Sequence, residues 1–394
     1  MKNQFFLGLF VIFVLTSCSN NSDDNYEVIP SYPFVEAEFG SSIDLNNLAN
    51  YANQIVPPYI TKNNSQGNVI TDKGATLGRV LFYDKNLSSN NTISCASCHK
   101  QEFAFSDTNV ASTGVNASTG RHSMRLINSR FATETKFFWN ERAINLETQT
   151  TMPIKDHGEM GFSGENGDLS FDDLITRLNG IGYYRELFKF VYGSEEITEN
   201  KIQNALAQFI RSIQSFDSKY DAGRALATND GQPFSNFTAQ ENQGKNLFLT
   251  PPVFNPNGVR TSGGLGCAGC HRAPEFDIDP NTLNNGIIGT IAGTGIDTGN
   301  TKAPTLRDLV KTDGTTNGPM MHTGVITSLQ AAIGHYGTIN IAPGNNNLDP
   351  RLRPGGLGQQ LNLTATEVNA VIAFLRTLSG TDVYTNQKWS NPFN

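Results

Sequence analysis

The sequence predicts a mostly α-helical protein built from two similar domains, with long ordered loops and few, short strands. The pentapeptide Cys-x-x-Cys-His occurs twice, at 95–99 and at 267–271, and each copy follows a similar short helical segment, 78–82 or 244–248. This pentapeptide has the spacing that attaches a c-type haem to a protein. We therefore expect two cytochrome c-like domains, each enclosing one covalently bound haem.

The two cysteines and the histidine of each pentapeptide are the expected attachment residues: Cys95, Cys98 and His99, then Cys267, Cys270 and His271. Two thiols add across the vinyl groups of one porphyrin, and the adjoining histidine binds the iron from the proximal side. A zinc clip or a redox dithiol also uses Cys-x-x-Cys, but neither requires a histidine directly after the second cysteine, twice. The motifs predict two haem c cofactors, with the two histidines as iron ligands.

The N-terminus has the features of a bacterial lipoprotein signal. Lys2 precedes an apolar run over residues 5–15, shorter than the roughly 20 residues of a transmembrane helix, and small residues lead into the fifth cysteine, Cys18. We expect residues 1–17 to be a signal peptide, Cys18 to be lipidated, and residues 18–40 to form a flexible tether to a membrane. An ordinary secretory signal is the alternative. Either version exports the chain, to the periplasm or to the cell surface.

The charge of the chain disfavours nucleic acid as a partner. The formal net charge is −7, and it becomes −8 without residues 1–17, because Lys2 is their only charged side chain. A negative surface repels nucleic acid. It attracts a basic donor protein but leaves a small quinol equally acceptable as an electron donor.

The boundary between the domains is expected near residue 225. Apolar residues recur at helical spacing within 201–220, and the segment 221–235, rich in Gly, Asn and Asp, is typical of a linker. The first haem domain then covers residues 41–225, and the second covers residues 226–394.

The second domain is expected to end in a helix that packs on its haem. Thr364 and Glu367 have the spacing of a capping box, apolar residues follow at helical spacing, and Gly380 marks the end. The segment 286–301, rich in Gly, Asn and Thr, lacks either periodicity and predicts an ordered loop over the cofactors.

Further short sequences in a fixed order resemble a known family. Phe137–Ala143 and Glu159–Gly161 follow the first haem motif, whereas Ala303–Asp308, Met321–Gly324 and His335–Gly337 follow the second. In this order they resemble the bacterial di-haem cytochrome c peroxidases and the MauG-like enzymes that share their fold. The resemblance spans residues 40–380, and it implies a peroxidatic haem in the first domain and an electron-transfer haem in the second.

The resemblance also implies roles for individual residues. Glu159 matches the family's distal glutamate, which carries a proton between the two peroxide oxygens, and Gln149 and Pro153 match residues of the same pocket. Trp139 matches the tryptophan that lies between the two haems and conducts electrons. On its own, Glu159 would be interpreted as a solvated surface charge and Trp139 as a core aromatic residue.

One departure from the classical peroxidases concerns the distal side of the first haem. Classical members carry a histidine between the first haem motif and the arginine that is here Arg121, but residues 100–121 contain none. We expect the first iron to have an open position without prior reduction. His122 is an alternative ligand, and its presence weakens the expectation of a calcium ion between the haems, which the resemblance implies.

A second departure concerns the sixth ligand of the second haem, which is methionine in classical members. The corresponding residue here is Tyr336, as in MauG, and Met321 and Met320 are the alternatives.

The sequence as a whole predicts an enzyme that reduces hydrogen peroxide to water. Electrons from a small cytochrome c, a cupredoxin or a quinol would enter at the second haem and pass by Trp139 to the first. A MauG-like oxidase acting on a protein or organic substrate is the alternative enzyme within the fold, and a non-catalytic di-haem electron carrier is the alternative from a different functional class. Family members are often dimers, so a homodimer is a further expectation.

Overall fold

The computed structural model describes residues 30–278 and 281–393. One compact unit begins at Tyr32 and contains the rest of the described chain. The predicted signal peptide and the lipidation site at Cys18 lie outside the described residues. None of the helices in the described residues has both the length and the hydrophobicity needed to cross a bilayer.

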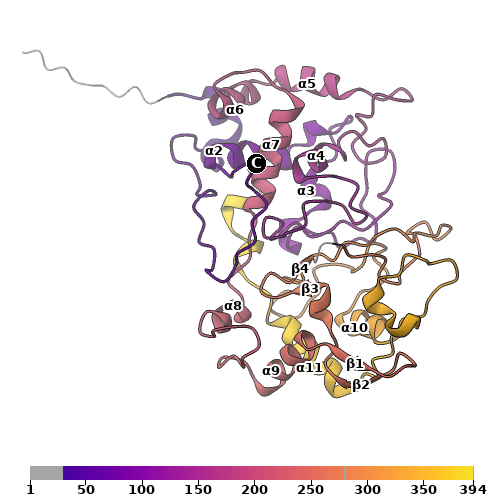
Figure 1. Cartoon of the computed structure of the whole chain (residues 1–394). Coiled ribbons are helices and arrows are strands. Elements are labelled where there is room, and N and C mark those ends of the chain that lie inside the picture. Colours follow the sequence, from indigo (N-terminus) through magenta and orange to yellow (C-terminus); the bar gives the residue numbers. More distant parts are fainter. Residues whose placement is uncertain (1–29, 279–280, 394) are drawn as a thin grey trace, which may run out of the picture. The chain divides into compact units, whose positions relative to one another are not determined.

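The first half of the compact unit is helical, as predicted. Its central helices begin at side-chain caps, in which Thr71 accepts from the backbone of Gly74 and Thr198 accepts from that of Lys201. Figure 1 shows α2, α6 and α7 close together in this half. The helices are α1 (Pro33–Phe39), α2 (Asp72–Tyr83), α3 (Cys95–Cys98), α4 (Leu146–Thr151), α5 (Phe171–Asn179), α6 (Gly182–Tyr192) and α7 (Glu199–Ser212).

The second half contains the remaining helices and all four strands found in the described residues. Each strand has two to four residues, and they form two separate antiparallel pairs, β1 with β2 and β3 with β4. The elements are α8 (Lys219–Arg224), α9 (Ala239–Leu249), β1 (Pro252–Phe254), β2 (Arg260–Gly263), β3 (His271–Arg272), β4 (Asp277–Ile278), α10 (Leu329–Gly337) and α11 (Ala365–Arg376). The prediction of a mostly helical protein with few strands is confirmed.

The same helix crossing occurs in both halves, and a glycine permits it each time. A Cβ atom on Gly78 of α2 would lie 2.0 Å from the carbonyl oxygen of Ala205 in α7. A Cβ atom on Gly244 of α9 would lie 1.9 Å from the carbonyl oxygen of Ala370 in α11. Only glycine allows two helix backbones to approach this closely. The repeated segments that precede the haem motifs are therefore the close-packed helices of two equivalent pairs.

Two hydrophobic cores surround these crossings. Buried residues of α2, α6 and α7 form the first core, and buried residues of α9 and α11 contribute to the second. Helix α11 begins at the predicted capping box, in which the Thr364 side chain accepts from the backbone of Glu367. The segment 286–301 contains no helix or strand, as expected for a loop. Helix α7 ends at Ser212, eight residues before Tyr220, and α8 occupies the start of the expected linker.

The structure differs from the predicted domain limits at both ends. Residues 33–39 of the expected tether form helix α1, because Val35 and Phe39 are buried in the first core. At the other end, Val383 and Trp389 are also buried in the first core, so the chain returns there after α11. The last residues of the predicted second domain, 226–394, thus pack in the first core, and the domain limits stay a prediction.

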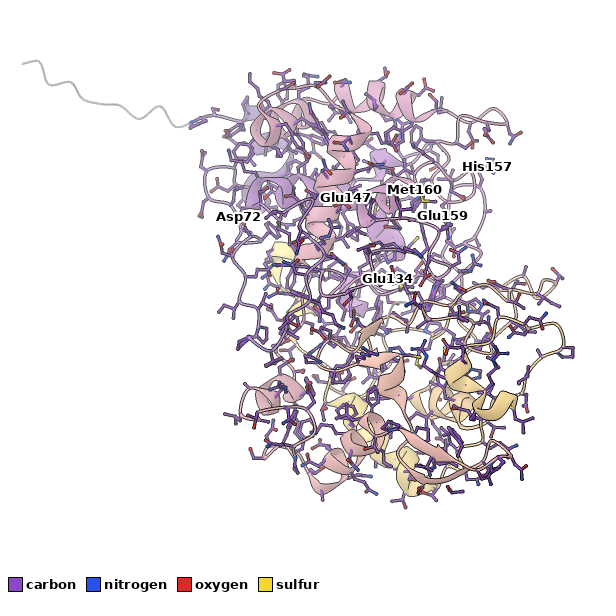
Figure 2. All side chains as sticks on the ribbon, viewed as in Figure 1. Asp72, Glu134, Glu147, His157, Glu159 and Met160 are labelled. Atoms are coloured by element: carbon purple, nitrogen blue, oxygen red, sulfur yellow. The ribbon has the colours of Figure 1, made fainter. Side chains whose placement is uncertain are left out.

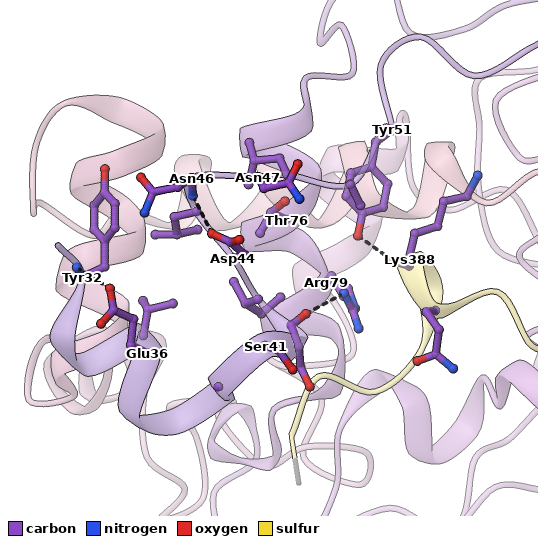
Figure 3. Close-up of a pocket in the computed structure, with 18 residues that line it drawn as sticks. Tyr32, Glu36, Ser41, Asp44, Asn46, Asn47, Tyr51, Thr76, Arg79 and Lys388 are labelled. Atoms are coloured by element: carbon purple, nitrogen blue, oxygen red, sulfur yellow. Dashed lines mark hydrogen bonds between the residues drawn. The ribbon is translucent and has the colours of Figure 1, made fainter. Parts of the chain in front are cut away.

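Hydrogen bonds to backbone carbonyls fix this returning segment. Tyr51 donates to the carbonyl of Lys388 at 2.5 Å, Tyr83 to that of Trp389 at 2.6 Å, and Arg79 to that of Ser390 at 2.7 Å. Figure 3 shows Tyr51, Arg79 and Lys388 around a cavity of about 740 Å³ between the segment 40–51 and the returning chain.

A buried ion pair joins the chain segments near the boundary. The Arg307 guanidinium is fully buried and contacts both carboxylate oxygens of Asp221, at 2.8 and 3.0 Å. Asp221→Asn should lower the free energy of unfolding by about 3–5 kcal/mol, because it leaves the buried cation without its counter-charge. Denaturation of the haem-loaded protein measures the change.

The matched control for this substitution is an exposed ion pair. Lys189 and Glu195 lie 3.6 Å apart with most of each side chain in solvent. Glu195→Gln should therefore cost less than about 1 kcal/mol. If both variants lost the same free energy of unfolding, the buried Arg307–Asp221 pair would contribute no more to stability than the exposed pair.

Candidate cofactor sites

The first attachment motif forms a one-turn helix at the edge of a cavity. Helix α3 spans Cys95–Cys98, with Ser94 and Ser97 forming a capping box, and His99 follows. His99 lines a cavity of about 450 Å³, and its Nδ1 lies 3.2 Å from the carbonyl oxygen of Phe105. A backbone partner on Nδ1 orients the ring and leaves Nε2 for a metal. Burial lowers the pKa of His99 to about 4, so the imidazole is neutral, as an iron ligand must be.

The second attachment motif lines a cavity of its own. Cys267 begins a 3₁₀ turn, Cys270 follows it, and His271 is the first residue of β3. All three border a mostly apolar cavity of about 560 Å³. Burial lowers the pKa of His271 to about 4, which keeps this imidazole neutral as well. Val371 and Leu375 of α11 line the same cavity, as expected for a last helix that packs on the second haem.

Both cavities suit a haem. Their volumes of about 450 and 560 Å³ lie within the usual range of about 300–1,000 Å³ for ligand sites. In the second, both thiols and the neutral imidazole line the space; in the first, His99 lines it, and Cys95 and Cys98 belong to the helical turn directly before His99. Each motif thus supplies the donor set of a c-type haem. The residues therefore fit two covalently bound haems.

The first cavity brings together the residues expected around peroxide. Gln149 of α4, Pro153 just after it, and Glu159 all line the cavity that His99 borders. Burial raises the pKa of Glu159, Asp156 adds to the rise, and Arg142 opposes it. The carboxyl group is thus a weaker acid than usual and lies near a cation.

Backbone hydrogen bonds hold Glu159 in place. The amide of Val115 donates to the carbonyl of Glu159 at 2.9 Å, and that of Asn116 donates to the carbonyl of Gly158 at 3.1 Å. A Cβ atom on Gly114 would lie 2.3 Å from the same Gly158 carbonyl. The stretch that carries a histidine in classical peroxidases therefore packs here against the Glu159 loop.

Sequence reasoning gave no role to Arg142, which also lines the first cavity. Its guanidinium lies 3.5 Å from the centre of the Phe138 ring, a cation–π contact that fixes the side chain. What distinguishes Arg142 is that its positive charge lowers the pKa of Glu159, against the effect of burial. This effect arises only in the folded chain and therefore could not be predicted from the sequence. Arg142 supplies positive charge where peroxide is expected to bind.

Trp139 belongs to a wall that borders both cavities. His122 and Lys302 line both cavities as well. The indole of Trp139 donates to the carbonyl of His122 at 2.7 Å, and the amide of Lys302 donates to the carbonyl of Trp139 at 2.8 Å. These bonds hold the indole between the two candidate haem sites.

Nε2 of His122 is buried without a hydrogen-bond partner, whereas its Nδ1 lies 3.0 Å from the carbonyl oxygen of Asn109.

The three predicted ligands of the second iron all line the second cavity. The hydroxyl of Tyr336 lies 4.0 Å from the sulfur of Met321, and the side-chain amide of Asn285 donates to that sulfur at 3.4 Å. Met320 is buried beside them. Burial raises the pKa of Tyr336, so the free side chain is a neutral phenol. The geometry brings Tyr336 and Met321 together but does not choose between them.

His157 and Trp389 lie outside both cavities. His157 is exposed, and its Nδ1 lies 2.7 Å from a carboxylate oxygen of Asp168; Figure 2 shows it farther from the centre of the molecule than Glu159. Trp389 is part of the first core. Among the described residues, no group of three or more His, Cys, Asp or Glu side chains could hold a metal ion. A calcium ion between the haems stays a prediction.

Two cavities, each lined by the histidine of a complete c-type haem attachment motif, define the class of the protein as a di-haem c-type cytochrome. A family model described as di-haem cytochrome c peroxidase matches residues 72–229. The methylamine utilization protein MauG of Methylophilus methylotrophus is 30% identical over 322 residues, which cover 79% of this chain and 84% of the relative. The cytochrome c551 peroxidase of Nitrosomonas europaea is 29% identical over 321 residues, covering 78% and 80% respectively.

A solved structure shows the same fold. A MauG-like protein associated with microbial copper homeostasis has 28% sequence identity and a TM-score of 0.65, covering 86% of this chain and 99% of its own. The chain belongs to the di-haem cytochrome c peroxidase family, which includes the MauG proteins, and it is an oxidoreductase of the peroxidase type. The predicted fold of two cytochrome c-like domains is thereby confirmed.

Proposed function

We propose that the protein reduces hydrogen peroxide to water at the cavity beside His99, with electrons from an external donor. The observation that carries the proposal is the joint placement of Glu159, Gln149 and Arg142 around that cavity. The stretch 110–120, which supplies no histidine, packs against the Glu159 loop instead. A cavity of this kind admits a small polar oxidant and offers it a base and donors.

The side chains divide the proton chemistry of the reaction between them. A haem held by His99 would supply the electrons that break the O–O bond. Glu159 accepts the proton of one peroxide oxygen and returns it to the other, so that the departing oxygen leaves as water. Gln149 can donate to that oxygen, and the Arg142 guanidinium opposes negative charge on it. In balance, one peroxide takes up two electrons and two protons and gives two waters.

Trp139 is proposed as the conductor between the two sites. Its indole lies in the wall that borders both cavities, and its position is fixed by hydrogen bonds to His122 and Lys302. An external donor would then reduce the protein at the second site, beside His271. A small cytochrome c, a cupredoxin or a quinol would each suit this role.

Turnover of the haem-loaded protein tests this function, and its pH dependence tests Glu159. With peroxide and a reduced donor, we expect sustained donor oxidation. Because burial raises the pKa of Glu159, the carboxylate that accepts the proton prevails only above that raised value. The rate of reaction with peroxide should therefore fall as the pH falls through it, starting above the usual range of a glutamic acid. Stopped-flow absorbance measures the profile; a flat profile would contradict this role of Glu159.

A MauG-like oxidase is the second candidate function, and Tyr336 favours it. The side chain lines the second cavity, where a tyrosine ligand would help to stabilise a highly oxidised protein. Such an enzyme would accumulate a long-lived oxidised state with peroxide when no donor is present, and it would oxidise a protein or organic substrate.

The ligand of the second iron can be tested directly. If Tyr336 binds that iron, Tyr336→Phe should change its ferric absorption and EPR spectra and Met321→Leu should leave them unchanged. The opposite result would assign Met321, since both side chains lie within 4.0 Å of each other in the cavity.

Export and membrane anchoring complete the proposal. A lipidated Cys18 would hold the enzyme at a membrane, in the periplasm or on the cell surface, and the enzyme would act as a monomer or a homodimer. Mass spectrometry of the isolated protein identifies the lipid.

A further inference from the structure

A buried carboxylate lies between two tyrosine hydroxyls in the first core. Tyr183 and Tyr184 lie in the first turn of helix α6, and the hydroxyl of each donates to the same oxygen of Asp84, at 2.7 Å. Their ring centres lie 4.7 Å apart. The other oxygen of Asp84 accepts from the amide of Asn86 at 2.7 Å, as the cap of a 3₁₀ turn. The cap explains the hydrogen bond to one carboxylate oxygen of Asp84. It does not explain why two tyrosine hydroxyls donate to the other oxygen.

This cluster is buried and has no counter-charge. The exposed fractions are 3% for Asp84, 7% for Tyr183 and 0% for Tyr184. In the described part of the chain, no basic side chain forms an ion pair with Asp84. A buried carboxylate without a cation is costly, and here only O–H and N–H donors offset its charge. Because one carboxylate oxygen already accepts a hydrogen bond from each phenol, it is positioned to receive the proton of either one.

The cluster and the first haem attachment residue share one hydrophobic core. Tyr184 is fully buried in that core, and Cys95 packs against it. Neither tyrosine lines the cavity that contains Glu159. In the loaded protein Cys95 would be bonded to the porphyrin, so the core that contains Tyr184 would adjoin the haem attachment point, outside the peroxide cavity and outside the wall that contains Trp139.

We propose that Tyr184, with Tyr183 and Asp84, is an electron reserve that reduces the first haem site after peroxide has oxidised it. This inference rests on the proposed function, because peroxide is the oxidant. Tyr184 gives one electron through Cys95, its O–H bond breaks, and the proton passes to Asp84. The products are a neutral tyrosyl radical, a protonated Asp84 and a first site reduced by one electron. The external donor later returns the electron, and Asp84 returns the proton.

The second tyrosine extends the reserve. The ring of Tyr183 is 4.7 Å from that of Tyr184, and the two hydroxyls share one oxygen of Asp84. Tyr183 can therefore give an electron to the Tyr184 radical while Asp84 returns its proton to Tyr184 and accepts the proton of Tyr183. The reserve is needed when the donor is scarce, since an oxidised site without electrons attacks the surrounding protein.

Low-temperature EPR of the haem-loaded protein, frozen rapidly after mixing with peroxide in the absence of donor, tests the proposal. We expect an organic radical signal whose hyperfine structure narrows when the protein contains ring-deuterated tyrosine. The signal should be lost in Tyr184→Phe. It should form about 10²-fold more slowly in Asp84→Asn, which keeps the cap but is a poor proton acceptor. Turnover with a plentiful donor should not change in Tyr184→Phe.

The matched control is Tyr192→Phe. Tyr192 is on the same helix, but its hydroxyl donates to the backbone carbonyl of Lys201 at 2.7 Å, with no carboxylate. The radical signal should persist in this variant. A signal of unchanged yield in the double variant Tyr183→Phe/Tyr184→Phe would overturn the proposal. So would a normal reaction with peroxide that gives no tyrosyl signal. A wild-type protein that does not react with peroxide would instead overturn the proposed function, and the reserve with it.

Discussion

Glu159→Gln is expected to slow the reaction with hydrogen peroxide by about 10²-fold or more, because a positioned proton carrier contributes about this much to the rate. Glutamine keeps the size of the side chain and its place beside Arg142 but cannot accept a proton. Stopped-flow absorbance at the haem bands, under single-turnover conditions, measures the rate. The pH dependence assigned to Glu159 should disappear in the same variant.

Glu165→Gln provides the control for this substitution. Glu165 is an exposed glutamate six residues further along the chain and does not line the first cavity. Its replacement removes the same charge from the surface and should leave the peroxide rate unchanged. An unchanged rate in Glu159→Gln as well would exclude Glu159 from the proton chemistry.

Features that depend on neighbouring residues could be predicted from the sequence. The haem motifs, the capping box at Thr364 and the glycines Gly78 and Gly244 are local signals, and each occurs in the structure at the expected place. Gly78 and Gly244 appeared only as parts of a repeat. The structure explains them, because each allows a helix backbone to contact its partner directly.

Contacts between distant segments could not be predicted in the same way. The return of Trp389 to the first core has no local signal, since any buried tryptophan would give the same pattern. Asp84 and Tyr184 are 100 residues apart, and only the packing of α6 near the end of α2 makes them neighbours. Arg142 stood in a quoted motif, yet its effect on Glu159 depends on how two loops face one cavity.

The sixth ligand of the second iron illustrates a different limit. Sequence reasoning proposed Tyr336 before Met321, and the structure places both in the second cavity with 4.0 Å between oxygen and sulfur. The choice depends on the iron itself, because phenolate favours the ferric state and thioether favours the ferrous state.

Removal of either pair of haem-binding cysteines is expected to separate the reaction with peroxide from the uptake of electrons from the external donor. In Cys95→Ser/Cys98→Ser the protein should retain half of its covalent haem and lose the reaction with peroxide, since His99 and Glu159 border the cavity that no longer holds a fixed cofactor. Pyridine haemochrome spectra and intact mass measure the haem content.

The reciprocal variant, Cys267→Ser/Cys270→Ser, should also retain half of the haem but behave differently. The cavity with Glu159, Gln149 and Arg142 is unchanged, so a first addition of peroxide should still react. Sustained oxidation of an external donor should stop, because electrons then lack the site beside His271 from which Trp139 is proposed to receive them. If this variant turned over normally with a donor, electrons would enter at the first site, and the route by Trp139 would be wrong. If instead it failed to react with peroxide at all, the reaction would belong to the second cavity, and the assignment of the two domains would have to be exchanged.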